Sequence, residues 1–120
     1  MTNRAEVEAL LPLPPAAFHI LLSLSLGDRH GYGIMQEVAA QTEGKMRISP
    51  GTLYGSIKRM IEQGLIHECD ERPDPELDDE RRRYYCITSF GRAVAGAETA
   101  RLSKLIGRAI ASLLPKSGPA

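Results

Sequence analysis

The segment 49–59 carries the side chains best suited to bind nucleic acid. Ser49 followed by Pro50 is a strong signal for the start of a helix, because serine caps a free backbone N–H and proline needs none at the first helical position. Free N–H groups at such a start attract phosphate, and Gly51 lets another backbone approach closely. We therefore expect this helix to enter the major groove of duplex DNA, where polar side chains read base edges. The outward polar and basic side chains would be Thr52, Tyr54, Ser56, Lys58 and Arg59.

Charge is unevenly distributed along the chain, although 15 basic and 15 acidic side chains cancel. Residues 29–59 hold five basic and two acidic side chains, and non-specific DNA affinity comes largely from neutralised phosphates. Residues 68–80 hold eight acids and one arginine, and three arginines follow at once. The acidic tip of this segment is unsuited to a minor groove. We expect the contact with the DNA backbone to come instead from Arg81 and Arg82, at the base of the segment. The alternative is that these arginines neutralise the neighbouring acids.

The other reactive side chains form no pattern of a metal or catalytic site. His19, His30 and His67 are too scattered for zinc, and the cysteines lack the spacing of a zinc motif. No local motif places a nucleophile beside a base, so we expect no enzyme and no cofactor. Cys69 and Cys86 fall on two neighbouring predicted strands, where buried thiols are expected rather than a redox switch.

The composition, with 42% apolar and 25% charged residues, is that of an ordinary globular domain. The chain has no apolar run of the roughly 18 residues that a membrane span needs, so we expect no membrane contact. Two cysteines are too few for a disulfide scaffold, which indicates a reducing cytoplasm.

Periodicity and start signals give the elements that would position these residues. Helices are expected at 16–26, 31–41 and 50–63, strands at 65–70 and 82–88, and a last helix at 90–114. This order predicts a mainly α fold, a winged helix-turn-helix of three helices plus a β-hairpin wing, with a long C-terminal dimerisation helix. The inward face of the third helix would consist of Leu53, Ile57, Met60 and Ile61.

The domain boundaries follow from these elements. We expect an N-terminal arm at 1–13, the DNA-binding domain at 14–88, the dimerisation helix at 89–115 and a tail at 116–120. The helices at 16–26 and 90–114 together show more apolar surface than a small monomer can cover, which predicts a homodimer. The expected interface consists of Leu21, Leu105, Ala109, Ile110 and Leu113.

Three stretches of sequence carry a family resemblance. They are His-Gly-Tyr-Gly-Ile-Met-Gln-Glu at 30–37, Ser-Pro-Gly-Thr-Leu-Tyr-Gly-Ser-Ile-Lys-Arg-Met-Ile-Glu-Gln-Gly-Leu-Ile at 49–66, and Arg-Arg-Tyr-Tyr-Cys-Ile-Thr at 82–88 followed by Gly91-Arg92. Together they resemble the PadR family of bacterial transcriptional regulators, over about residues 13–114. With one helix after the wing, the chain is similar to the short-tailed branch of that family.

The resemblance implies a homodimeric protein that binds double-stranded DNA, usually as a repressor, with Tyr32 near the DNA backbone. It also implies a small-molecule effector near the dimer interface, for which an apolar or aromatic compound is expected. The expected walls of that site are Phe18, Leu22, Leu102 and Ile106. The alternative function is a winged-helix module that binds proteins and not DNA, which the acidic segment 68–80 favours.

Overall fold

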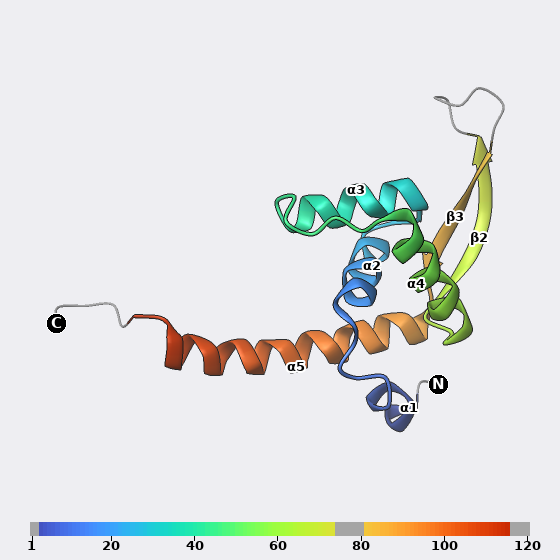
Figure 1. Ribbon diagram of the computed structural model, residues 1–120. Helices are drawn as coiled ribbons and strands as arrows, with labels where there is room; N and C mark the ends of the chain where they lie inside the picture. Colours follow the sequence, from blue (N-terminus) through green and yellow to red (C-terminus); the bar gives the residue numbers. More distant parts are fainter. Residues whose placement is uncertain (1–2, 74–80, 116–120) are drawn as a thin grey trace.

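The computed structural model describes the backbone of residues 3–73 and 81–115, and the side chains of residues 3–70 and 82–115. Helices dominate, and a small antiparallel sheet lies at one end of them (Figure 1). This arrangement confirms the predicted mainly α winged helix-turn-helix. The elements in chain order are α1 (Arg4–Glu8), α2 (Pro15–Ser25), β1 (Arg29–His30), α3 (Gly31–Gln41), α4 (Pro50–Glu62), β2 (Ile66–Pro73), β3 (Arg81–Ile87) and α5 (Ser89–Leu113).

Side-chain caps fix where three helices begin. Ser49 accepts a hydrogen bond from the N–H of Thr52 at the start of α4, at 3.2 Å. At α5 the hydroxyl of Thr88 accepts from the N–H of Gly91, at 2.9 Å. At α3 the cap is His30, whose Nδ1 accepts from a backbone N–H. Each cap satisfies a donor that a helix start leaves free, so local sequence sets these boundaries.

The hydrophobic core is built around α2, which packs against α3, α4, α5 and β3. Leu21 has no exposed surface, so its predicted place in a dimer interface is wrong: the chain's own residues cover this side of α2. On α4 the inward face includes Leu53, Ile57 and Met60 as predicted, whereas Ile61 is 40% exposed. Most of the exposed large apolar side chains therefore lie on α5, while Leu22 of α2 is 38% exposed and Leu26 at the end of α2 is 64% exposed.

The sheet contains a strand that the sequence did not indicate. Its order is β1–β3–β2, all antiparallel, and β1 pairs Arg29 with Tyr85 and His30 with Tyr84. The sequence predicts only a turn there, because two residues give no period to recognise. The third strand ties the start of α3 to the wing strand β3.

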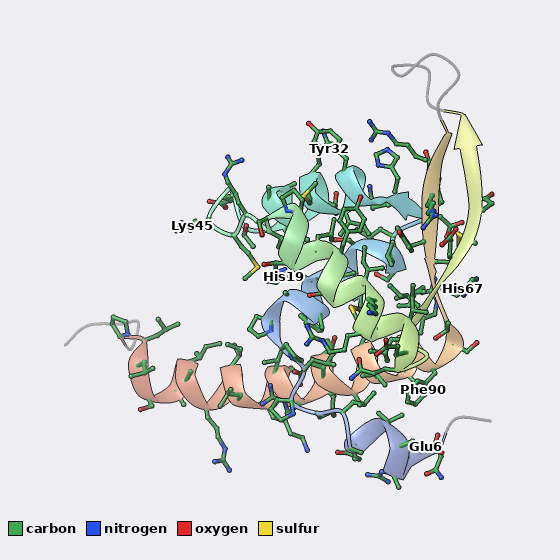
Figure 2. All side chains as sticks on the ribbon, turned by 45° about the vertical axis from the view of Figure 1, so that its right-hand side comes forward. Glu6, His19, Tyr32, Lys45, His67 and Phe90 are labelled. Carbon is green, nitrogen blue, oxygen red and sulfur yellow. A yellow bond between two sulfur atoms is a disulfide. The ribbon has the colours of Figure 1, made fainter. Side chains whose placement is uncertain are left out.

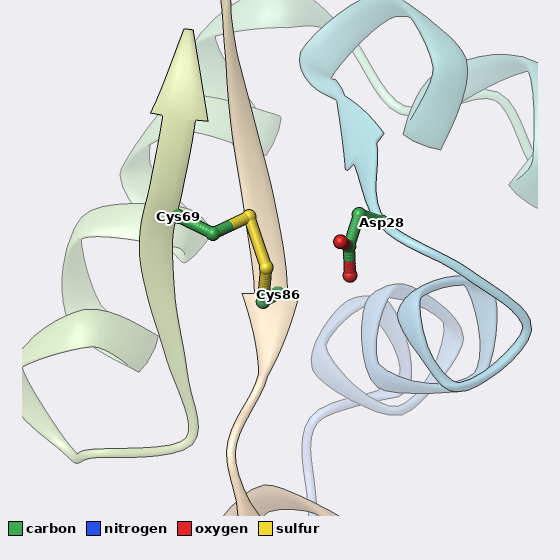
Figure 3. A group of neighbouring side chains, drawn as sticks. All are labelled: Asp28, Cys69 and Cys86. Atoms are coloured by element: carbon green, nitrogen blue, oxygen red, sulfur yellow. A yellow bond between two sulfur atoms is a disulfide. The ribbon is translucent and has the colours of Figure 1, made fainter.

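A disulfide joins Cys69 and Cys86 across β2 and β3, with Cα atoms 5.8 Å apart (Figure 3). The expectation of two thiols is therefore wrong for this structure. The register pairs Cys86 with His67, and an irregularity between Glu68 and Asp70 turns Cys69 toward Cys86. A bulge of this kind redirects a side chain locally, and period-2 reasoning from the sequence cannot place it.

The N-terminal arm is docked on α5. Val7 of α1 is buried, and the N–H of Leu13 donates to the buried Oε2 of Glu98, at 2.7 Å. Arg101 donates to the same carboxylate. These hydrogen bonds, above all the one from Arg101, outweigh burial and lower the pKa of Glu98 below its usual range.

Beyond its contacts with α1 and α2, α5 continues away from the rest of the molecule (Figure 1). Most of its residues from Ser103 onward are exposed. Among the described helices, none has the length and apolar character that crossing a membrane requires.

Candidate nucleic-acid interface

The outward face of α4 is small, polar and positively charged along most of its length. Gly51 and Gly55 lie on it, and a Cβ added at either would meet no atom within 4 Å. Lys58 and Arg59 are exposed on the following turn. A helix with two bare glycines on its exposed side lets another molecule approach its backbone closely, with cations at the far end.

The hydroxyls at the start of α4 are already ordered. The hydroxyl of Ser49 donates to Oγ1 of Thr52 at 3.1 Å, while it accepts from the N–H of the same residue. The Thr52 hydroxyl therefore keeps its own proton for an outside acceptor, such as a phosphate oxygen or a base edge. Both side chains are exposed, as the sequence predicts.

Ser56 is not part of this surface. It is 8% exposed and faces the arm, in a small hollow lined by Leu10, Leu13 and Pro14. The prediction of a DNA contact from Ser56 is corrected for this reason. Ser56 lies at the edge of the inward apolar face of α4. It is covered because the N-terminal arm packs against this edge, which the helical period alone does not indicate.

Tyr54 packs over the first residue of α3. A Cβ added at Gly31 would overlap the Tyr54 hydroxyl, so the ring lies this close to α3 only because residue 31 is glycine. Half of Tyr54 remains exposed. This contact gives a physical reason why the motifs at 30–37 and 49–54 occur together: one supplies the glycine and the other supplies the ring.

A hollow of about 440 Å³ lies where α3, α4 and β3 meet, at the starts of both helices. Arg82 reaches into it with its guanidinium carbon 5.7 Å from the centre of the Tyr32 ring, and Nη1 lies 3.3 Å from Nδ1 of His30. These contacts hold a cation beside two helix N-termini. The hollow is lined by His30, Gly31, Tyr32, Met35, Pro50, Tyr54, Arg82, Arg83 and Tyr85.

Ring side chains support this hollow from several elements. His30 stacks on Tyr32 and meets Tyr84 edge-on, with ring centres 6.5 and 5.3 Å apart. Tyr32 is exposed on the α3 side of the molecule, far from Glu6 in α1 (Figure 2). Tyr85 is buried, and burial above all raises its pKa, so the phenol stays neutral.

The wing arginines divide between two roles. Arg83 forms an ion pair with Glu68 at 3.7 Å, which matches the alternative that these arginines neutralise nearby acids. Both Arg82 and Arg83 line the hollow, so Arg83 combines the two roles. The side chain of Arg81 and the residues 74–80, which include much of the acidic segment, lie outside the described residues.

The residues predicted for the effector site are only partly brought together. Phe18 and Leu22 line a hollow of about 200 Å³ between α2 and α5, together with Arg92 and Thr99. Leu102 and Ile106 lie further along α5 and do not line it. A second hollow of about 490 Å³ lies between α1 and α5, beside Arg101 and Lys104, which the sequence analysis did not anticipate.

The predicted interface residues of α5 lie on its free part. Leu105, Ile106 and Ile110 each keep about half of their surface exposed, and Leu113 keeps 77%. Ala109 lies between them and is half-buried. This row is apolar and contains every residue predicted for the dimer interface except Leu21. It also contains Ile106, which was predicted as a wall of the effector site.

The potential metal ligands do not form a thiolate site. Among the described residues, Asp28, Cys69 and Cys86 place ligand atoms within 4.8 Å of one another, but both sulfurs belong to the disulfide. The Nδ1 atom of His19 lies 2.9 Å from Oε1 of Gln41, and Nδ1 of His30 caps α3.

The fold and this surface together define a winged helix-turn-helix protein. The chain belongs to the PadR-like family of transcriptional regulators, whose model matches residues 20–97. The resemblance carried by the motifs at 30–37 and 49–66 is thereby confirmed. The family consists of regulators rather than enzymes, in agreement with the sequence prediction.

Solved structures share the fold. A PadR-like regulator from Bacillus cereus has a TM-score of 0.70 at 18% identity, covering 93% of this chain and 99% of that one. A regulator from Clostridium thermocellum has a TM-score of 0.64 at 23% identity, covering 91% and 97%.

Two sequence relatives are uncharacterised proteins. One, from transposon Tn4556 of Streptomyces fradiae, is 30% identical over 80% of this chain, which spans only 25% of that 37.1 kDa protein. The other, from Lysinibacillus sphaericus, is 36% identical over 62% of this chain and 66% of its own length.

Proposed function

We propose that this protein is a sequence-specific DNA-binding regulator that acts in the cytoplasm as a homodimeric repressor. The observation that carries the proposal is the outward face of α4, which combines an ordered Ser49–Thr52 pair, the exposed Gly51 and Gly55, and two cations one turn further on. The start of α4 would enter the major groove, and Thr52 would donate to a base edge or a phosphate oxygen.

The hollow beside α4 supplies the backbone contact in this proposal. A phosphate oxygen seated there would face two helix N-termini, the Arg82 guanidinium and the hydroxyls of Tyr32 and Tyr54. Phosphate contacts of this kind fix the position of a protein on DNA, while the groove contacts read sequence. Arg81 would extend the same contact along the wing.

Dimerisation would hold two α4 helices on one face of DNA. Two recognition helices of a symmetric dimer enter successive major grooves roughly 34–36 Å apart and read a near-palindrome. The exposed row from Leu105 to Leu113 on α5 supports this part of the proposal, since an apolar row of this length needs a partner.

The small hollow beside Phe18 and Leu22 supports relief of repression by an apolar or aromatic effector. It lies between α2 and α5, so a ligand there would change how the DNA-binding domain is joined to the dimerisation helix. Such a ligand acts only if it binds the DNA-competent and incompetent dimers with different affinity.

The function is tested by selecting genomic fragments with the full chain and titrating one selected duplex with salt. Lys58→Ala should weaken binding and lower the salt slope by about one unit, as for one lost phosphate contact. Lys104→Ala on α5 is the matched control, because it removes the same charge away from α4.

Two results would count against this function. Equal salt slopes for the two lysine variants would show that Lys58 contacts no DNA phosphate. A chain that enriches no fragment at all, but retains a protein partner, would instead support the protein-interaction module, which the exposed acids Glu68 and Asp70 on β2 favour.

A further inference from the structure

The Cys69–Cys86 disulfide lies at the base of the wing, beside the candidate DNA surface. Cys86 directly follows Tyr85 on β3, and the same strand delivers Arg82 to the hollow between α3 and α4. Both cysteines are half-buried rather than enclosed, so a small oxidant or reductant has access to the sulfurs.

The fold does not depend on this bond for its core. The buried cluster is formed almost entirely by apolar side chains of the five helices and the sheet, and both cysteines lie outside it. Small disulfide-dependent domains use such bonds because their cores are too small, and that reason is absent here. The bond instead clamps two neighbouring strands that are already paired by backbone hydrogen bonds.

We propose that Cys69 and Cys86 form a reversible redox site whose state sets the affinity for DNA. The inference rests on the proposed function, because a protein that binds DNA works in a compartment where thiol reductants keep most cysteines reduced. Disulfides in such compartments are usually transient and act as redox sensors. Peroxides are the oxidant class that fits, and dithiols are the reductant class.

A peroxide and a dithiol are sufficient to balance both the oxidation and the reduction of the cysteine pair. One cysteine thiolate attacks the O–O bond of a peroxide, forms a sulfenic acid and releases water or an alcohol. The second thiol then displaces water from that sulfenic acid and closes the S–S bond. A dithiol reverses the bond by exchange: two electrons and two protons pass to the protein sulfurs, and the reductant becomes a disulfide.

The expected direction follows from where the bond lies. In the oxidised protein the bulge at Cys69 is tied to β3, the strand that carries Tyr84 and Arg82, and the bond restricts the movement of these two side chains. Reduction frees the bulge, and those side chains must then be ordered when DNA binds. Preorganisation improves affinity mainly by removing such ordering costs, so the oxidised form should bind about tenfold more tightly.

The test uses the full chain and one duplex recovered in the genomic selection, at fixed salt. The protein is reduced with dithiothreitol, or re-oxidised with hydrogen peroxide, and free thiols are counted by alkylation and mass. We expect two thiols after reduction, none after peroxide, and an affinity that follows this count. Cys69→Ser with Cys86→Ser should bind like the reduced chain in both conditions, and Cys69→Val with Cys86→Val replaces that variant if it does not fold.

Three results would overturn the proposal. They are equal affinity in both redox states, a peroxide response that persists in the cysteine-free variant, and two thiols that peroxide fails to join. If neither redox form binds any duplex, the DNA-binding function itself is wrong, and the claim about affinity fails with it. Counting free thiols by alkylation needs no DNA, and it would still show whether the disulfide breaks and forms again.

Discussion

At the residue scale, the two glycines of the outward α4 face differ in what they cost the protein. Gly51 belongs to the first turn, whereas Gly55 lies in the helix interior, where glycine is less stable than alanine by roughly 0.5–1 kcal/mol. Added methyl groups would meet nothing in the protein at either position. A residue that weakens its helix and relieves no internal clash needs an outside reason, and a closely approaching DNA groove supplies one.

Gly55→Ala should therefore have opposite effects on stability and on binding. We expect the free energy of unfolding to rise by about 0.5–1 kcal/mol, because alanine is the better helix former. DNA affinity should fall, because the methyl group would stand between α4 and the groove. Urea unfolding and salt-matched binding to a selected duplex measure the two effects.

Gly107→Ala on α5 provides the control for that substitution. Gly107 is also exposed, interior to a helix and free of neighbours within 4 Å of an added Cβ. It should raise stability by a similar amount and leave DNA affinity unchanged. Unchanged affinity in the Gly55 variant would show that α4 does not approach DNA through this face.

At the element scale, the helices were predictable because their signals are local. Ser49, Pro50 and the spacing of Leu53, Ile57 and Met60 define α4 without help from the rest of the chain. The strand β1 carries no such signal, because its pairing partner Tyr84 lies more than fifty positions away. The disulfide was not predicted for a similar reason. The direction of the Cys69 side chain depends on a bulge in β2, and no local sequence pattern indicates that bulge.

The candidate site was likewise predictable where local sequence sets the position of a side chain, and not where tertiary packing does. Thr52, Lys58 and Arg59 follow from the helical period and are exposed as expected. Ser56 was misplaced because a neighbouring element, the N-terminal arm, covers a position at the edge of the helix face. Periodicity gives the direction of a side chain from its helix axis, but the tertiary packing determines what lies there.

Glu98 links two elements, and its removal should loosen both. Glu98→Ala leaves the buried N–H of Leu13 without its acceptor, which should cost about 1–3 kcal/mol of stability. Glu98→Gln keeps an acceptor oxygen but loses the charge that pairs with Arg101, so its cost should be smaller. Chemical denaturation of both variants at pH 7 measures the difference.

Acid should reduce the advantage of the wild-type chain over Glu98→Gln. The pKa of Glu98 is lower in the folded protein than its ordinary value of 4.5, so the carboxylate stabilises the fold above that value. The contribution is lost as pH falls through the lowered pKa. The stability gap should therefore narrow below about pH 4.5. A gap that stays constant down to acid unfolding would contradict this assignment.

At the scale of the whole molecule, the winged-helix part of the chain is globular and α5 protrudes from it. The principal extents are 64, 35 and 22 Å, and α5 runs along the longest of them (Figure 1). The arm, α2 and the start of α5 share one core, so α1 belongs structurally to the helix that leads out of the domain.

The protruding half of α5 carries the exposed apolar row that we propose as the dimer interface. Leu105→Asp with Ile106→Asp places two charges in the middle of its apolar row, where burial against a partner would desolvate them. We expect this variant to sediment as a monomer at concentrations where the wild-type chain is a dimer. Its DNA affinity should fall by about 100-fold or more, because binding of the second half-site is no longer intramolecular.

Gly107→Asp with Ala111→Asp adds the same two charges to the same helix, at exposed positions on its opposite side. This control should remain dimeric and bind DNA as the wild-type chain does, which separates loss of the interface from loss of helix stability. A dimer that survives in the Leu105 and Ile106 variant would move the interface away from this row. The hollow between α1 and α5 would then be the next surface to test, because it also joins the arm to the helix that leaves the domain.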